Sequence, residues 1–315
     1  MTDSNGSWER DLITKLARDA LVEQRRRRRW GIFFKLLTFA YITFALIVFV
    51  DWGGRGDFAG GKKTTAVVEM NGVIAPGTDA SAENVILGLQ AAFKDKSTQG
   101  VILRINSPGG SPVQAQTIYD EMRRLRKKYP DIPLYAVVED ICASGGYFVA
   151  AAADRIYVGK ASVVGSIGVL MNGFGFTGLM DKIGIERRLI TAGENKGMLD
   201  PFSPLREKDK EYVHVLMKDI HQQFIAAVRE GRGKRLKETP DMFSGLFWTG
   251  EKSVQLGLAD GYGSLDSVAR DVIKAEDVVD YTRKENFAER VARRFGASVA
   301  ASLADYAIRS LPVIR

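Results

Sequence analysis

Cysteine and histidine are scarce in this chain of 315 residues, which holds one cysteine and two histidines. A single cysteine excludes an internal disulfide and a cysteine-rich zinc site, and two histidines disfavour a histidine-rich metal site, so we expect no metal and no cofactor. Cys142 is interpreted as a small buried residue rather than a thiol nucleophile. His214 and His221 stand seven residues apart on one face of a predicted long helix, which is typical of a structural pair and not of a catalytic triad.

The composition is that of an ordinary folded protein, with 45% apolar and 26% charged residues, and the length allows one large or two modest domains. The formal net charge of +7 is uneven, because the unbroken basic run Arg25–Arg29 stands directly before an apolar segment. That placement favours a membrane lipid surface over nucleic acid as a partner.

The apolar segment, residues 30–52, is long enough for one helix to cross a bilayer, and Lys35 lies near enough to its start to reach the headgroups. Tryptophans at both ends suit the two interfaces, and the arginines hold residues 1–29 in the cytoplasm. A cleavable signal peptide is the alternative, but the run is longer than its usual core and lacks an Ala-x-Ala site. We therefore expect an uncleaved, single-pass anchor in the inner membrane, with the rest of the chain on the extracytoplasmic, periplasmic side.

After a glycine-rich linker at residues 53–63, strand-like and helix-like runs alternate. Strands are predicted at residues 65–70, 101–105, 134–138, 155–158 and 186–191, and helices at 82–94, 112–128, 145–152, before 184, at 207–231 and before 257. This alternation predicts an α/β domain over residues 64–273, with mainly parallel strands and its site at their carboxyl ends. Residues 274–315 end in a basic amphipathic tail that suits a membrane surface, a neighbouring subunit or solvent.

Two loops follow predicted strands and carry the chemistry. The run "NSPGG", residues 106–110, is a turn whose glycines let backbone N–H groups face a ligand, and "CASGGY", residues 142–147, exposes Ser144 at the start of a buried helix. Each motif alone is common in ordinary turns. Together they predict a serine nucleophile beside an oxyanion cradle.

A serine nucleophile needs a partner that takes its proton, and the histidines are poorly placed for that role. Lysine can replace histidine where burial disfavours the ammonium form. Lys196 stands in a glycine-bounded loop before an apolar, proline-rich run, whereas Lys160, Lys182 and the lysines of the long helix have more ordinary settings. Spacing alone does not select one lysine.

Five motifs, "NSPGG", "ASGGY", "GSIGV", "AGENKGMLDPF" and "GLADGYG", occur in the order found in the signal peptide peptidase A family of membrane-bound serine proteases, which residues 64–273 resemble. The resemblance implies a crotonase-like or Clp-protease-like spiral of ββα units. It implies that Ser144 is the nucleophile and Lys196 the general base, that Gly109, Gly110 and Gly145 supply the oxyanion hole, and that Tyr147 and Phe202 contact substrate.

The resemblance has two departures. Glu194 and Asn195 precede the lysine where relatives more often have an aromatic or polar residue, which bears on substrate preference. The chain also carries a single copy of the domain, and single-copy members resemble assemblies in which a neighbouring protomer supplies the lysine. A homo-oligomer that cleaves apolar peptides, such as remnant signal peptides, through an acyl-enzyme is therefore expected.

Two other functions remain open at this stage. A crotonase-type enzyme acting on acyl-CoA would share the fold and the paired backbone N–H groups but has no use for the serine or the anchor. A non-enzymatic membrane scaffold of protease-derived fold would have no need of an intact Ser144 and Lys196.

Overall fold

The computed structural model describes residues 15, 18, 23–44 and 63–283. Residues 23–44 are helical and belong to a unit separate from the one that begins at residue 61. Across the described ranges, no helix combines the length and the apolar character that crossing a bilayer requires. Part of the predicted anchor, residues 45–52, lies outside the described residues, as do most of the predicted cytoplasmic segment and linker and the tail from residue 284.

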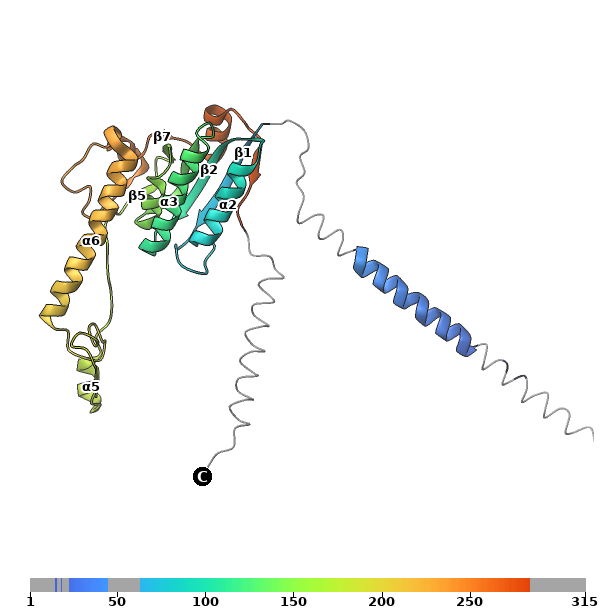
Figure 1. The fold of residues 1–315 in the computed structure, drawn as a ribbon, viewed down its shortest axis with the longest axis horizontal. Coiled ribbons are helices and arrows are strands. Elements are labelled where there is room, and N and C mark those ends of the chain that lie inside the picture. Colours follow the sequence, from blue (N-terminus) through green and yellow to red (C-terminus); the bar gives the residue numbers. More distant parts are fainter. Residues whose placement is uncertain (1–14, 16–17, 19–22, 45–62, 284–315) are drawn as a thin grey trace, which may run out of the picture. The chain divides into compact units, whose positions relative to one another are not determined.

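The larger unit is an α/β domain, as predicted, built on one sheet with the strand order β6-β5-β3-β2-β1-β8. Every strand pairing is parallel except that between β5 and β6 (Figure 1). The strands are β1 (Thr64–Asn71), β2 (Thr98–Ser107), β3 (Leu134–Ala143), β4 (Arg155–Val158), β5 (Val163–Gly165), β6 (Phe247–Thr249), β7 (Gly261–Tyr262) and β8 (Val278–Asp280). The helices are α2 (Ala82–Lys94), α3 (Pro112–Lys128), α4 (Gly145–Ala150), α5 (Thr177–Ile183), α6 (Glu207–Arg232), η1 (Gly233–Arg235), α7 (Gly250–Gln255), α8 (Leu265–Ser267) and η2 (Val268–Ile273).

The first two helices of the domain begin where the sequence predicts. Ser81 caps α2 by accepting a hydrogen bond from the N–H of Asn84, and Ser111 caps α3 in the same way, with Pro112 in its first turn. Helices α2, α3 and α4 bury their apolar sides against one face of the sheet and form the main core. The other face carries a smaller core under η2, around Val67, Ile102 and Val268.

Strand β8 pairs with β1, so the sheet continues beyond residue 273, where the sequence analysis ended the domain. Its three residues are too short to stand out as a periodic pattern. The N–H of Tyr281 also donates to the carbonyl of Val67, and the Tyr281 hydroxyl donates to Asp95 at 2.6 Å. These bonds attach the last described residues firmly to the edge of the sheet.

Strand β3 is longer than predicted and divides its pairing between two neighbours. Residues 135–138 pair with β4, whereas residues 141–143 pair with β5. The sequence analysis ended this strand at Val138 because two acidic residues follow. Glu139 instead remains in the strand with its carboxylate 2.9 Å from Arg104, on a partly exposed part of the sheet. The added length carries the chain directly to Ser144.

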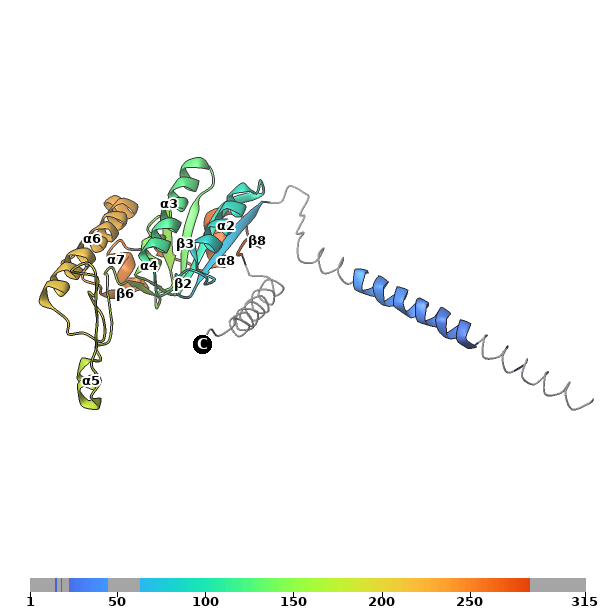
Figure 2. The ribbon, with the colours of Figure 1, turned by 60° about the horizontal axis from the view of Figure 1, so that its bottom comes forward.

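The predicted strand at residues 186–191 is wrong: this stretch is irregular and pairs with no described strand. A β-strand is stable only beside a hydrogen-bonded neighbour, and a high content of β-branched residues does not replace that neighbour. It belongs to a projecting segment, residues 171–206, which we call the arm. The arm contains α5 and lies far from the sheet, beside the first turns of α6 (Figures 1 and 2).

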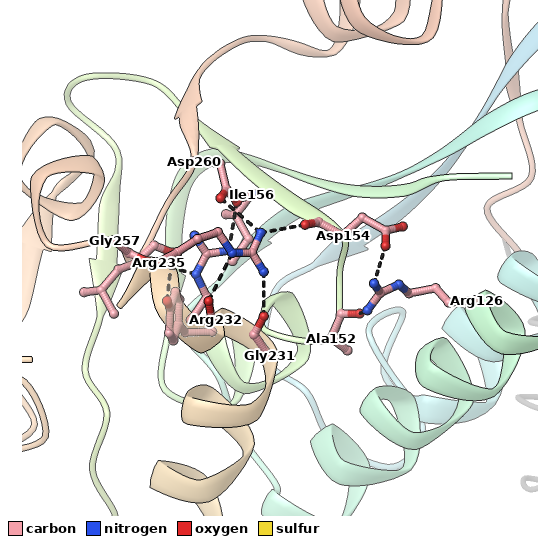
Figure 3. A network of polar contacts seen from close by, with 11 residues as sticks. Arg126, Ala152, Asp154, Ile156, Gly231, Arg232, Arg235, Gly257 and Asp260 are labelled. Atoms are coloured by element: carbon pink, nitrogen blue, oxygen red, sulfur yellow. Dashed lines mark hydrogen bonds and ion pairs between the residues drawn. The ribbon is translucent and has the colours of Figure 1, made fainter. Parts of the chain in front are cut away.

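A polar network fastens α6 to the turn after α7 (Figure 3). The Arg232 side chain has no exposed area, and it donates to the carbonyl of Gly257 at 2.9 Å and to the carboxylate of Asp260 at 2.8 Å. Burial would raise the pKa of Asp260, but the hydrogen bond and the charge of Arg232 outweigh burial and hold that pKa below its usual value. Arg232 and Asp260 therefore stabilise one another as a charged pair.

The same network reaches the end of α4. Arg126 donates to the carbonyl of Ala152 at 2.7 Å and pairs with Asp154, whose other oxygen accepts the N–H of Leu134 at 2.8 Å (Figure 3). Gly231 packs so close to α4 that an added Cβ would lie 2.0 Å from the Ala151 carbonyl oxygen. The helix that begins at Ser144 is thus held at its far end by α3 and α6.

Replacing Arg232 with Met should lower the free energy of unfolding by about 3 kcal/mol, because it leaves the Asp260 carboxylate without its main buried partner. Arg229→Met is the matched control, since Arg229 pairs with Glu238 at 2.7 Å on the surface of the same helix and should cost under about 1 kcal/mol. Urea denaturation of the two variants at pH 7 measures both losses in the free energy of unfolding.

The pH dependence provides a second readout. The contribution of ionised Asp260 to the free energy of unfolding should be fully present above about pH 4. It should disappear as the pH falls through the lowered pKa of Asp260 in the folded state. A stability difference between Arg232→Met and wild type that is equal at pH 7 and at pH 3 would contradict this account.

Candidate active site

Ser144 stands in a strained turn between β3 and α4. Its φ of 52° and ψ of −125° lie outside the regions that residues other than glycine usually occupy. The turn is held by a hydrogen bond of 2.8 Å from the Ser144 N–H to the carbonyl of Gly165. Strain of this kind persists where the surrounding structure imposes it, and it presents the serine at the start of a helix, as the sequence predicts.

The loop at residues 107–110 packs directly against this turn, and glycine is required for the contact. A Cβ on Gly109 would lie 2.7 Å from the Gly145 nitrogen and 2.8 Å from the Cβ of Ser144. A Cβ on Gly110 would lie 2.1 Å from the carbonyl oxygen of Ile74. The two predicted loops therefore meet, backbone against backbone.

The three predicted oxyanion donors differ in availability. The Gly109 N–H donates to the Ser107 hydroxyl at 3.1 Å, so it is already occupied within the chain. The N–H groups of Gly110 and Gly145 donate to no other described residue, and a Cβ on Gly145 would lie 3.3 Å from the Gly110 nitrogen. Gly110 and Gly145 thus form an adjacent donor pair, whereas Gly109 supports the loop.

A cavity of about 560 Å³ opens beside Ser144. Its walls come from α3, α4, α6 and the loops around residues 108, 168 and 245. The lining residues nearest in sequence to the two motifs are Pro108, Gly110, Ser144, Gly145 and Phe148, and those from α3 and α6 are Pro112, Ala115, Gln116, Ile220, Gln223 and Phe224. The lining combines apolar side chains with polar ones, Gln116, Gln223 and Ser244 among them, and the serine and the N–H pair lie on one side.

Some of these positions were missed by the sequence analysis. Phe148 stands four residues after Ser144 on the same side of α4, so helical spacing was a usable signal for it. Phe224 packs on Phe148 with ring centroids 5.2 Å apart, yet it stands on α6, 76 residues further along the chain. No local pattern could have joined Phe224 to the site.

Tyr147 does not line the cavity. Its side chain is completely buried, and its hydroxyl donates to the carbonyl of Leu258 at 2.8 Å. Cys142 is buried as well, as expected, and burial raises the pKa of both groups. In the structure Tyr147 anchors α4 to the "GLADGYG" turn, and substrate contact from this residue is not supported.

Lys196 and Phe202 lie on the arm. The Lys196 side chain is exposed, its N–H donates to the carbonyl of Gly193, and Phe202 stacks on Phe176 with centroids 5.4 Å apart. Within the described part of the chain, no residue between 171 and 219 lines the cavity. One chain by itself therefore does not bring Lys196 to Ser144.

Both histidines lie in surroundings typical of structural residues, in agreement with the sequence analysis. His214 is exposed on α6, whereas His221 is half-buried with its Nε2 atom 3.1 Å from the carbonyl oxygen of Ile167. In the described ranges, no group of three or more histidine, cysteine, aspartate or glutamate side chains is placed to hold a metal ion.

The fold and the strained serine define a Clp-protease-like α/β protein, and the family model of Clp proteases matches residues 67–163. A second model, described as peptidase family S49, matches residues 126–279. A relative named "Putative protease MJ0651" from Methanocaldococcus jannaschii is 32% identical over 76% of this chain and 81% of its own length. The chain belongs to peptidase family S49, the family of the signal peptide peptidases that its motifs resemble.

Two further relatives match over different fractions of this chain and of their own lengths. "Putative signal peptide peptidase SppA" of Enterococcus faecium is 28% identical over 70% of this chain and 66% of its own length. "Na(+)/H(+) antiporter NhaA" of Brucella abortus is 44% identical over 209 residues, which are 65% of this chain. The match spans only 28% of that antiporter, so the similarity concerns one part of a much longer protein.

Replacing Gly109 with Ala should slow the labelling of Ser144 by a fluorophosphonate about 100-fold, because the new methyl group displaces Ser144 and the Gly145 N–H by about 1 Å. Gly72→Ala is the matched control. Gly72 also has a positive φ, 85°, but a Cβ there meets nothing within 4 Å, so this variant should lose about 1–2 kcal/mol of stability and keep its labelling rate. Equal labelling of both variants would show that the contact at Gly109 is not needed.

Proposed function

We propose that this protein is a membrane-anchored serine endopeptidase that cleaves apolar peptides through an acyl-enzyme. The observation that carries the proposal is the strained Ser144 beside the N–H groups of Gly110 and Gly145, which donate to no described residue, at the edge of the cavity. Membership of family S49 favours this function over a crotonase-type acyl-CoA enzyme and over a scaffold without activity.

The reaction begins when an uncharged lysine amine takes the proton of the Ser144 hydroxyl. The serine oxygen then attacks the peptide carbonyl carbon, and the carbonyl oxygen becomes an oxyanion that accepts hydrogen bonds from Gly110 and Gly145. The peptide C–N bond breaks as the protonated lysine returns its proton to the leaving amine. Water, deprotonated by the same lysine, then attacks the ester and releases the acyl product, and the protonated lysine returns its proton to the Ser144 oxygen.

The lysine is Lys196, and we propose that a neighbouring protomer supplies it. Support comes from the arm, which carries Lys196 away from its own sheet and leaves large apolar side chains exposed, among them Phe174 (83%) and Ile190 (95%). Exposed apolar surface of this extent is typical of an interface between subunits. A homo-oligomer would cover it and complete each site.

Mixing two inactive variants tests this arrangement. Ser144→Ala and Lys196→Ala should each abolish cleavage of an apolar fluorogenic peptide. Co-expressed in equal amounts, they should restore about a quarter of the wild-type activity, because half the protomers keep the serine and half of their neighbours keep the lysine. Activity no higher in the mixture than in the single variants would refute a lysine from the neighbour.

Apolar peptides fit the cavity because Ala115, Phe148, Ile220 and Phe224 surround the space beside Ser144. Remnant signal peptides, with their apolar cores, are the substrates we propose, in line with the name of the Enterococcus relative. Phe202, on the arm next to Lys196, would contact the peptide in the neighbour's site if the arm reaches it.

The anchor is proposed from residues 30–52 and the arginines before them. Residues 30–44 of this run are helical, and Trp30, Phe33, Phe34 and Leu37 are among its exposed apolar side chains, which suits contact with lipid. The domain that follows would then lie on the extracytoplasmic face of the inner membrane, where peptides released into or left in the bilayer are within reach.

Cell fractionation tests the anchor and its orientation. The full-length protein should stay in the membrane pellet after an alkaline carbonate wash, because an apolar helix is not released by breaking ionic contacts. Added protease should degrade the catalytic domain in spheroplasts and leave it intact in inverted vesicles. Release by carbonate, or the opposite protease pattern, would contradict the proposed location.

A further inference from the structure

One side of the cavity is a short backbone segment, residues 165–169, which we call the wall segment. Beyond Gly165 it belongs to no strand, and Ser166, Gly168 and Val169 line the cavity. Its first residues are fixed by two backbone hydrogen bonds, from the Ser144 N–H to the Gly165 carbonyl at 2.8 Å and from the Ser166 N–H to the Leu246 carbonyl at 2.7 Å. Beyond Ser166, Gly168 packs against Gly245, since an added Cβ would lie 3.0 Å from the Gly245 Cα, and a side-chain hydrogen bond to the backbone of the segment comes from His221.

His221 joins the wall segment to the opposite side of the cavity. Its Nε2 atom lies 3.1 Å from the carbonyl oxygen of Ile167, and since a carbonyl only accepts, Nε2 carries the proton. The residues that flank His221 on α6, Ile220, Gln223 and Phe224, line the cavity themselves. One side-chain hydrogen bond therefore connects two of the cavity walls.

The wall segment has open space behind it. A second hollow, of about 440 Å³, is lined by Val169 together with residues of α6, namely His214, Val215, Met217, Lys218 and His221. Val169 lines both spaces, so the segment at this point is one residue thick. The Ile167 side chain is fully buried in the main core, so the part of the segment that borders the hollow is Gly168 and Val169, and the hydrogen bond from His221 fixes the Ile167 carbonyl that precedes them.

We propose that His221 is a positioning residue for the peptide substrate, which sets the separation of the wall segment and α6 and thereby the width of the cavity. The inference rests on the proposed function, because it takes a peptide as the occupant. His221 makes no contact with the reacting atoms. Its effect should appear in substrate binding and not in the chemistry at Ser144.

The test uses three variants of the full-length protein. His221→Phe keeps a ring of similar size and removes the donor, His221→Gln keeps an N–H donor, and His214→Phe makes the same change seven residues earlier on α6, where the structure shows no bond to the wall segment. For an apolar peptide, His221→Phe should raise KM about five- to tenfold with kcat within about twofold. His221→Gln should recover most of the loss, and His214→Phe should match wild type.

Fluorophosphonate labelling of Ser144 separates positioning from general damage. The small probe needs the serine, its lysine base and the two N–H donors, and it does not fill the cavity, so its labelling rate should be unchanged in all three variants. If His221→Phe lowers labelling and kcat together, or leaves KM unchanged, the inference is wrong. If His221→Phe does not fold, His221→Gln tests the proposal by itself. The KM of His221→Gln should then stay close to that of wild type, and a five- to tenfold rise in its KM would overturn the proposal.

Peptide binding makes the inference independent of turnover. Fluorescence anisotropy should show a labelled apolar peptide binding about five- to tenfold more weakly to Ser144→Ala/His221→Phe than to Ser144→Ala. Weaker binding with no cleavage by wild type would overturn the proposed function and leave the role of His221 standing. Cleavage by wild type with equal binding by both variants would overturn the role of His221 alone, and a peptide that neither binds nor is cleaved would overturn both.

Discussion

The contact between two backbone turns, residues 107–110 and 143–146, is the constraint on which the rest of the domain depends. At Gly109 and Gly110 there is no room for a side chain, and Ser144 adopts a positive φ to complete the contact. Strands β2 and β3 have to end side by side for the turns to meet, and pairing of Ser107 with Cys142 keeps them together to their last residues. The sheet, the cavity and the N–H pair all follow from that alignment.

The forked pairing of β3 explains how the serine reaches this position. Its first half belongs with β4, and its second half turns to β5, whose last residue Gly165 accepts the hydrogen bond that holds Ser144. The far end of α4 is fastened by Arg126 and by the close approach of Gly231, and its middle by Tyr147. Ser144 is thus positioned from both ends of α4 by groups that do not line the cavity.

The arm contrasts with this rigid centre. It has little contact with its own sheet, exposes large apolar side chains and carries the lysine that the resemblance assigns to the base. An assembly would explain such a segment, because a second copy of the chain would bury the exposed apolar area. A protease built this way would be inactive as a single chain and active only when its copies come together.

Much of the domain could be predicted because its signals are local. Helix starts at residues 82 and 112, alternation of strand and helix, and glycines in the two loops all depend on a few neighbouring residues, and each was correctly predicted. The errors came where the outcome depends on a distant neighbour. Strand β3 continues past Val138 because β5 is there to pair with it, and residues 186–191 form no strand because no strand lies beside them.

The sequence by itself determined the type of fold, the serine at its turn and the family, because these rest on short motifs whose backbone demands are the same in any context. Only the tertiary structure decided which groups share the site. It joined Phe224 and His221 of α6 to the serine loop, moved Tyr147 into the core, reserved Gly110 and Gly145 as the free donors and left Lys196 outside the chain's own cavity. Those placements arise from the packing of elements far apart in the chain, and no local pattern encodes them.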